Sequence, residues 1–269
     1  MLQHMRVVAL LAAYNEERFI GGCLAHLVAQ GVESYLIDHS STDRTVEIAE
    51  SYRGRGLIGI ERVPRGQPPS WREILERKEE LARELDAEWF LHADPDEVRL
   101  PPRQGITLAE ALAEVDHLGY NAVSFQEFTF VPWREEPDHD HPRFRETMRR
   151  YYPCLAQSPD QVKAWKRQER VDLVSTGGHH VRFPGLHLYP EPFPMRHYLF
   201  LSVEHAIRKY CLRGWDPAEV ADGWHVRRAA LRPEHITLLP ERELRAYVAD
   251  ADLDASHPWT SHPLFAARS

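Results

Sequence analysis

The 269-residue sequence has few cysteines, no long apolar run and no excess of positive charge. Its three cysteines, Cys23, Cys154 and Cys211, are widely spaced and odd in number. This argues against a disulfide framework or a zinc knuckle and is compatible with a reducing cytoplasm, where we expect the protein. No run approaches the roughly 20 apolar residues of a membrane-spanning helix, so we expect no integral membrane segment. The formal charge of −8 argues against nucleic acid or an anionic membrane as a partner.

The sequence also lacks a glycine-rich phosphate-binding loop, since neither G-x-G-x-x-G nor G-x-x-x-x-G-K-[ST] occurs. A bound phosphate would therefore need a metal ion instead of a cradle of backbone amides. Hydrophobic residues make up 43% and charged residues 28% of the chain, an ordinary balance for a globular protein. No linker separates two independent segments, so we expect one domain over residues 1–269.

The first hundred residues alternate between short apolar runs and amphipathic segments. The runs predict strands at 6–13, 34–38, 57–63 and 89–91, and the segments between them predict helices at 16–30, at 44–55 and after the capping box of Ser70 with Glu73. Strand–helix alternation of this kind predicts an α/β fold with a mostly parallel sheet and crossover helices.

The rest of the chain is less regular. Thr107 and Glu110 form a capping box that predicts a helix ending at His117. Further elements are expected as strands at 120–131, 162–167 and 171–183, and as helices at 202–212, from 217 and at 240–251. Segment 132–159 is rich in proline and long for a structureless loop, and the tail 256–269 is expected to be extended. The basic run of Lys163, Lys166, Arg167 and Arg170 could contact phosphate or an acidic acceptor, but we expect it at the surface.

Three carboxylates follow the fourth strand in the run HADPDE at 92–97. Pro95 suits a strand end because it has no N–H and a fixed φ. The carboxylates would repel one another unless a cation lies beside them. Asp94 and Asp96 offer the oxygen ligands that Mg²⁺ or Mn²⁺ prefers, and Mg²⁺ usually shares its shell with substrate phosphates. The run therefore indicates a metal–diphosphate site, although a lone D-x-D is more often a solvated acidic turn.

Polar residues follow three of the expected strands: Tyr14-Asn15-Glu16 the first, Asp38-His39-Ser40 the second and Asp94-Pro95-Asp96 the fourth. In an open α/β sheet, ligands bind beyond the carboxyl ends of the strands, near a switch point. One site that draws on all three groups is a stronger prediction than any group alone. Within it, Asp38 would accept hydrogen bonds from a base or a ribose.

These motifs, in this order, resemble those of the family 2 glycosyltransferases. The runs are LLAAYNEERFIGGCL, YLIDHSSTDRTVEIA and WFLHADPDEV, and the later run RHYLFLSVEHAIRKY resembles the His-Tyr motif of one subgroup. The resemblance covers roughly residues 7–100 and is loose from 120 to 200. It implies the GT-A fold, a Rossmann-like, mostly parallel sheet flanked by helices. It also implies a nucleotide-binding half over 1–100, an irregular acceptor-side half over 101–215 and C-terminal helices and tail over 216–269.

The resemblance further implies a nucleotide-diphosphate sugar donor, Mn²⁺ or Mg²⁺, and a carbohydrate or small-molecule acceptor. The residues that it implies for the nucleotide are Ala12, Tyr14, Asn15, Glu16, Asp38 and Asp94. Asp94 and Asp96 would form the D-x-D pair on the metal, with His197 as the candidate third ligand. His39 and Ser40 replace an acid and a glycine of the usual family run. The way in which the family recognises the nucleobase therefore carries over less directly to this sequence.

An inverting sugar transfer needs a carboxylate base on the acceptor side of the donor. Glu127 is the first candidate because it interrupts an apolar strand, and Glu204 is the second because it begins the helix after His197. The loop acids Asp138 and Asp140 come third. Two other functions stay open: a nucleotidyltransferase on a related α/β fold, whose glycine-rich loop is missing here, and a non-catalytic module that binds nucleotide sugars.

Overall fold

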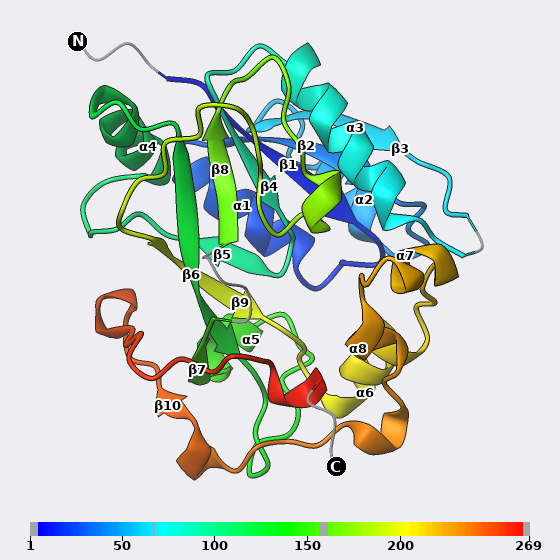
Figure 1. Cartoon of the computed structure of the whole chain (residues 1–269). Helices are drawn as coiled ribbons and strands as arrows, with labels where there is room; N and C mark the ends of the chain where they lie inside the picture. Colours follow the sequence, from blue (N-terminus) through cyan, green and yellow to red (C-terminus); the bar gives the residue numbers. More distant parts are fainter. Residues whose placement is uncertain (1–4, 67, 156–160, 266–269) are drawn as a thin grey trace. The chain divides into compact units, whose positions relative to one another are not determined.

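The computed structural model describes residues 5–66, 68–155 and 161–265, and the chain divides into two compact units (Figure 1). Unit 1 consists of Met1–Arg65, Trp71–Phe125 and Pro159–Met195, and unit 2 of Gly66–Ser70, Gln126–Ser158 and Arg196–Ser269. The single domain and the boundaries near residues 100 and 215 stay predictions.

A mostly parallel sheet forms the centre of unit 1. Its parallel strands are β1 (Val7–Ala13), β2 (Glu33–Asp38), β3 (Leu57–Arg62) and β4 (Trp89–Ala93), in the order β3-β2-β1-β4. β8 (Gln161–Lys166) pairs antiparallel with β4, and the first residues of β6 (Ala122–Phe130) pair antiparallel with β8. Every residue of β1 is buried, as expected for a central strand that is covered on both faces. The predicted α/β fold class is confirmed.

Helices cover both faces of this sheet (Figure 1). The helices of unit 1 are α1 (Ile20–Ala29), α2 (Thr45–Glu50), α3 (Trp71–Glu84) and α4 (Leu108–His117). Apolar side chains of α1 and α4 pack in one cluster with Ala9 and Leu11 of β1. The alternate side chains Val8 and Leu10 point to the opposite face, where α3 contacts β1. The sheet therefore leaves only its strand ends and edges for binding.

Local signals explain where these helices begin. The side chain of Thr107 accepts the backbone N–H of Glu110, and the Glu110 carboxylate accepts that of Thr107, so the predicted capping box is confirmed. α1 begins at Ile20, four residues later than predicted, because the chain first turns at Asn15, which has a φ of +56°. Asparagine tolerates this left-handed conformation better than most residues.

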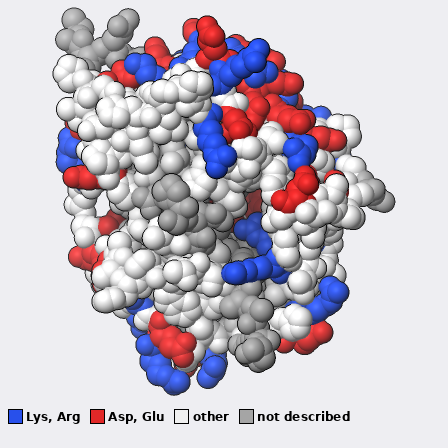
Figure 2. Space-filling view, viewed as in Figure 1, with Lys and Arg blue, Asp and Glu red and all other residues white. Residues whose placement is uncertain are grey.

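The charged surface of α3 carries both signs, and Figure 2 shows acidic and basic side chains interspersed over this region. Arg77 lies at the centre of one such group, where it pairs with Glu61, Glu80 and Glu84. The pairs with Glu80 and Glu84, whose side chains are 49% and 55% exposed, contribute little to stability individually. Unit 1 also contains β5 (Glu97–Arg99), which pairs with β9 (Phe193–Tyr198).

Unit 2 contains a small antiparallel sheet and several short helices. Its strands are the second part of β6, β7 (Arg150–Cys154) and β10 (Arg245–Ala246), and its helices are α5 (Phe144–Thr147), α6 (Val203–Ala206), α7 (Pro217–Ala221) and α8 (Val226–Ala229). α6 continues into a π-helical turn, Ile207–Cys211. The rings of Tyr151, Tyr198 and Tyr247 surround Phe130, with centroids 5.0–5.5 Å from it. Aromatic packing therefore holds unit 2 together across distant segments.

Segment 132–159, which is long for a structureless loop, contains α5 and β7 within its described residues. Two predictions for the second half are wrong. Segment 171–183 is not a strand, because it turns through the 3₁₀ helix Val174–Thr176. Segment 240–251 forms no α-helix, because β10 within it pairs with β7 instead. Pairing with a strand far away in sequence here overrides the local helix propensity. No helix in the described part of the chain combines the length and apolar character that crossing a bilayer requires.

Candidate functional site

The carboxyl ends of β1, β2 and β4 lie beside one another in unit 1. Ala13 of β1 is in register with Asp38 of β2, and Leu11 of β1 is in register with Ala93 of β4. The polar groups that begin at Tyr14, Asp38 and Asp94 therefore follow neighbouring strands. Their expected proximity in the sheet is confirmed, and their roles in binding stay predictions.

Hydrogen bonds fix the turn after β1 against the turn after β2. The Asn15 side-chain oxygen accepts the N–H of Thr42 at 2.8 Å, and the Ser41 hydroxyl accepts the N–H of Asn15 at 3.0 Å. The N–H of Glu16 donates to the hydroxyl of Thr45 at 2.7 Å. These bonds hold the predicted nucleotide-binding turn in one conformation, with Ala12 buried just before it.

Asp38 is completely buried at the end of β2. Each of its carboxylate oxygens lies 3.2 Å from the N–H of Ser41, which donates to them. Arg62 Nε lies 3.5 Å from the second oxygen, so the charge is partly met within the protein. Arg65 follows Arg62 closely in the sequence. Its guanidinium lies 3.7 Å from the centroid of the Tyr14 ring, a cation–π contact.

The acidic end of β4 is not simply a solvated turn. The side chain of Asp94 is 31% exposed, but Asp96 and Glu97 are buried. Glu97 accepts hydrogen bonds from Lys163 Nζ at 2.7 Å and from the Arg99 guanidinium at 2.5 Å. Lys163 is itself only 4% exposed, so the prediction that it lies at the surface is wrong.

A second buried lysine adds to this cluster. Lys78 Nζ donates to the carbonyl oxygen of Ala93 at 3.2 Å, and Lys163 Nζ lies 3.9 Å from an Asp94 oxygen. Burial alone would raise the pKa of Asp94, but Lys163 and Lys78 bring it below its ordinary value. Burial lowers the pKa of Lys78 to about 8. Lys78, Lys163 and Arg99 thus supply the positive charge that the sequence argument assigned to a bound cation.

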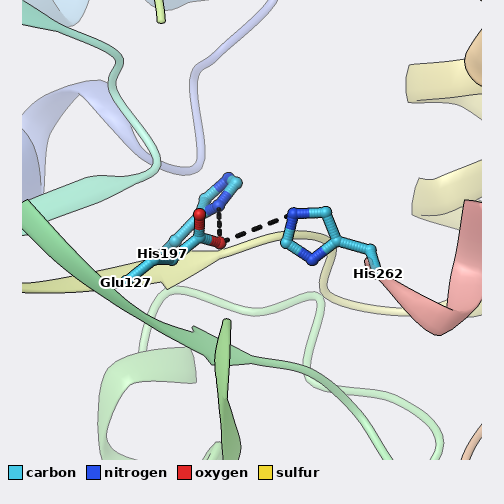
Figure 3. A group of neighbouring side chains, drawn as sticks. All are labelled: Glu127, His197 and His262. Carbon is cyan, nitrogen blue, oxygen red and sulfur yellow. Dashed lines mark hydrogen bonds and ion pairs between the residues drawn. The ribbon is translucent and has the colours of Figure 1, made fainter. Parts of the chain in front are cut away.

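A second cluster of titratable side chains lies in unit 2 (Figure 3). It consists of Glu127 from β6, His197 from β9 and His262 from the C-terminal segment. His197 Nδ1 lies 2.7 Å from Glu127 Oε1, and His262 Nε2 lies 3.7 Å from the same oxygen. The Thr129 hydroxyl also donates to this oxygen, at 2.7 Å. Glu127 is only 3% exposed, so these partners replace water around its carboxylate.

The surroundings set the charge of this cluster. Burial acts to raise the pKa of Glu127, but His197 and His262 outweigh it and hold that pKa well below its usual range. Burial lowers the pKa of His262 to about 4, against the opposing effect of Glu127. At neutral pH, Glu127 is therefore ionised and His262 is neutral. The His262 ring is positioned by Tyr152, whose hydroxyl lies 3.0 Å from Nδ1.

The N-terminal part of the sequence matches a known family. Residues 9–72 match the sequence model described as Glycosyl transferase family 2. This segment is of the family 2 glycosyltransferase type. The resemblance inferred from the sequence is confirmed over these residues, which run from β1 to the start of α3 and end before Asp94. No curated protein sequence matches the chain.

Solved structures offer more distant similarities. S. aureus TarS is 14% identical, with a TM-score of 0.46, over 86% of this chain and 41% of that chain. TarS 1-349 in complex with UDP-GlcNAc is 15% identical, with a TM-score of 0.45, over 86% of this chain and 69% of that one. The mannosyltransferase PcManGT from Pyrobaculum calidifontis, in complex with GDP-Man and Mn²⁺, is 15% identical, with a TM-score of 0.45, over 84% and 71%. This chain thus spans less than half the length of the first of these proteins.

The residues that were predicted to form one metal site belong to different units. Asp94 and Asp96 belong to unit 1, and His197 belongs to unit 2, so their grouping stays a prediction. Glu204 projects from α6 with a side chain that is 81% exposed and pairs with Arg208 at 2.7 Å. The role of His262 was not predictable from the sequence, because a histidine before a proline in an irregular tail carries no periodic signal.

Proposed function

We propose that this protein is a metal-dependent glycosyltransferase that moves a sugar, with inversion, from a nucleotide-diphosphate sugar to an acceptor hydroxyl. One observation carries the proposal: the polar ends of β1, β2 and β4 lie side by side in a chain whose residues 9–72 match the family model. Ligands bind at such strand ends in open α/β sheets. The three free cysteines of this protein are consistent with the predicted cytoplasmic location, because thiols stay reduced there.

The nucleotide would bind at the ends of β1 and β2. Ala12, Tyr14, Asn15 and Glu16 would line one side, and Asp38 would contact the base or the ribose. The hydrogen bonds between the two turns support this assignment, because a site that is already rigid loses less conformational entropy on binding. Asp38 already accepts the N–H of Ser41, so a nucleotide donor group would share its carboxylate.

The residues at the end of β4 fit a hard divalent cation that arrives with a diphosphate. Asp94 and Asp96 supply carboxylate oxygens, and Asp94 is partly open to solvent. Mn²⁺ or Mg²⁺ bound there, with His197 as the proposed third ligand, would supply Lewis-acid neutralisation to the leaving diphosphate. Because Lys78 and Lys163 already balance the carboxylates, the cation would bind weakly until the diphosphate adds negative charge.

The acceptor hydroxyl needs a proton acceptor, and we propose Glu127 or Glu204 for this role. Glu127 is held rigidly by His197 and Thr129. Its lowered pKa is a disadvantage, because proton transfer is most effective when the pKa of the base lies near the operating pH. Glu204 is exposed and therefore accessible to an acceptor.

The test is a thermal-shift and calorimetric panel of nucleoside diphosphates with Mn²⁺. We expect at least one nucleoside diphosphate to bind in a Mn²⁺-dependent manner and Asp96→Asn to abolish that binding. Asp86→Asn serves as the control, since the Asp86 side chain is 97% exposed. Equal Mn²⁺-dependent affinity in wild type and Asp96→Asn would refute the metal assignment. Nucleotide binding without sugar transfer would favour the binding module, and release of pyrophosphate would favour the nucleotidyltransferase.

A further inference from the structure

We propose that Glu127, His197 and His262 form a second metal site, which takes a zinc-type divalent ion without any nucleotide (Figure 3). All three side chains belong to unit 2. They offer two imidazoles and one carboxylate as metal ligands, a set that suits first-row transition ions better than Mg²⁺. The proposal goes beyond the diphosphate-linked cation at Asp94 and Asp96. It is an alternative to His197 as the third ligand of that cation and to Glu127 as the base, because the second ion would occupy both side chains.

The geometry is close to that of a metal shell. One ligand atom from each residue lies within 4.8 Å of the other two. Zinc–nitrogen and zinc–oxygen bonds of about 2.1 Å place tetrahedral ligand atoms about 3.4 Å apart. The distance from His262 Nε2 to Glu127 Oε1 is 3.7 Å, and that from His197 Nδ1 to the same oxygen is 2.7 Å. Small side-chain rotations that open the shorter contact would accommodate an ion between the three residues.

Neighbouring groups orient the ligands as they do in known metal sites. A metal-bound histidine usually makes a hydrogen bond through its other ring nitrogen, which fixes the ring. His262 Nδ1 lies 3.0 Å from the Tyr152 hydroxyl, which leaves Nε2 directed at Glu127. The Thr129 hydroxyl donates to the Glu127 carboxylate and restrains it in turn. Both supporting residues come from neighbouring strands, β6 and β7, which pair with each other.

The site would join three segments that are distant in the sequence. Glu127 lies on β6, His197 on β9 and His262 between the 3₁₀ helices Asp250–Asp252 and Pro263–Phe265. An ion bound to all three would fix the C-terminal segment to the two strands. Because the unfolded chain cannot present these ligands together, the binding energy would appear as folding stability.

The first test is equilibrium dialysis of the full chain, stripped with a chelator, against Zn²⁺ without nucleotide. We expect about one tightly bound ion in the wild type and at least ~10-fold weaker binding in His262→Ala and His262→Gln. His117→Ala, an exposed histidine at the end of α4, should bind like the wild type. Asp96→Asn should also keep the ion. A failure of the second metal site can therefore be distinguished from a failure of the proposed metal–diphosphate site. No tight ion in the wild type, or equal binding in both His262 variants, would overturn the proposal.

Two further measurements separate ligand loss from misfolding. In the presence of EDTA, the His262 variants should unfold at a temperature close to that of the wild type, and only the wild type should gain stability with Zn²⁺. Tyr152→Phe keeps the ring but removes the hydroxyl at His262, and it should weaken Zn²⁺ binding by about 10-fold, as for other groups that orient metal ligands. With Co²⁺, the wild type should show a visible absorption band that His262→Gln lacks. A Zn²⁺-induced stabilisation of His262→Gln equal to that of the wild type would refute the assignment.

Discussion

Replacing Lys163 with Met should strongly destabilise unit 1. Lys163 is 4% exposed, and its Nζ lies 2.7 Å from the carboxylate of Glu97, which is 5% exposed. Methionine keeps the length and most of the volume but removes the charge. Removing one partner from a buried ion pair typically costs about 3–5 kcal/mol, and we expect the lower part of this range because Arg99 still pairs with Glu97.

Lys166 supplies a matched control three residues along the same strand, β8. Its side chain is 46% exposed, and it pairs with Asp116 at 2.6 Å. Exposed pairs of this kind contribute about 0–1 kcal/mol, so Lys166→Met should change stability little. The two variants therefore carry the same substitution on one strand and differ mainly in burial.

The assay is urea denaturation followed by far-UV circular dichroism, with the free energy of unfolding from linear extrapolation. Glu97→Gln removes the carboxylate partner of both Lys163 and Arg99, so it should cost at least as much as Lys163→Met. If Lys163→Met and Lys166→Met cost the same, or if Glu97→Gln costs less than Lys163→Met, the buried charges do not stabilise the acidic end of β4.

Three other predictions address the proposed sites. Asp38→Ala should weaken nucleotide binding about 10-fold, because a buried polar partner is worth ~1–3 kcal/mol; an unchanged dissociation constant would count against its role. Glu127→Gln should lower kcat by ~10²-fold or more if Glu127 is the base, whereas loss of activity only in Glu204→Gln would assign the base to α6. Burial lowers the pKa of Lys78 to about 8, so the unfolded state holds the extra proton between pH 8 and 10.5. The free energy of unfolding should therefore rise by about 3 kcal/mol over this interval, and a rise of equal size in Lys78→Met would contradict the assignment.

The order of elements in the first hundred residues was predictable because each signal there is local. Apolar runs of strand length define β1 to β4, and the amphipathic stripe of α3 lies on the buried side of that helix. The Thr107 capping box gives the start of α4 from two side chains three residues apart. Each of these features depends on residues that are close in the sequence, so the local sequence is enough to predict it.

Features of the candidate sites that depend on distant pairing were not predictable in this way. Lys163 is buried because Glu97, 66 residues earlier, accepts its charge. Without that partner, a basic run such as that of residues 163–170 is a solvated surface. β10 forms where a helix was predicted, because Arg245 and Ala246 pair with β7. His262 approaches Glu127 only through the folding of the whole of unit 2, and no spacing rule links the two positions.

The charges at the end of β4 bear directly on how a metal and a donor would bind. Three carboxylates at one strand end need positive charge beside them, and Lys78, Lys163 and Arg99 supply it. A divalent ion that enters alone would therefore approach a cluster with little net charge, and Coulomb attraction to it would be small. A diphosphate restores the negative charge and offers its own oxygens to the ion. It follows that Mn²⁺ affinity at Asp94 should depend on the nucleotide, whereas ion affinity at the proposed site of Glu127, His197 and His262 should not.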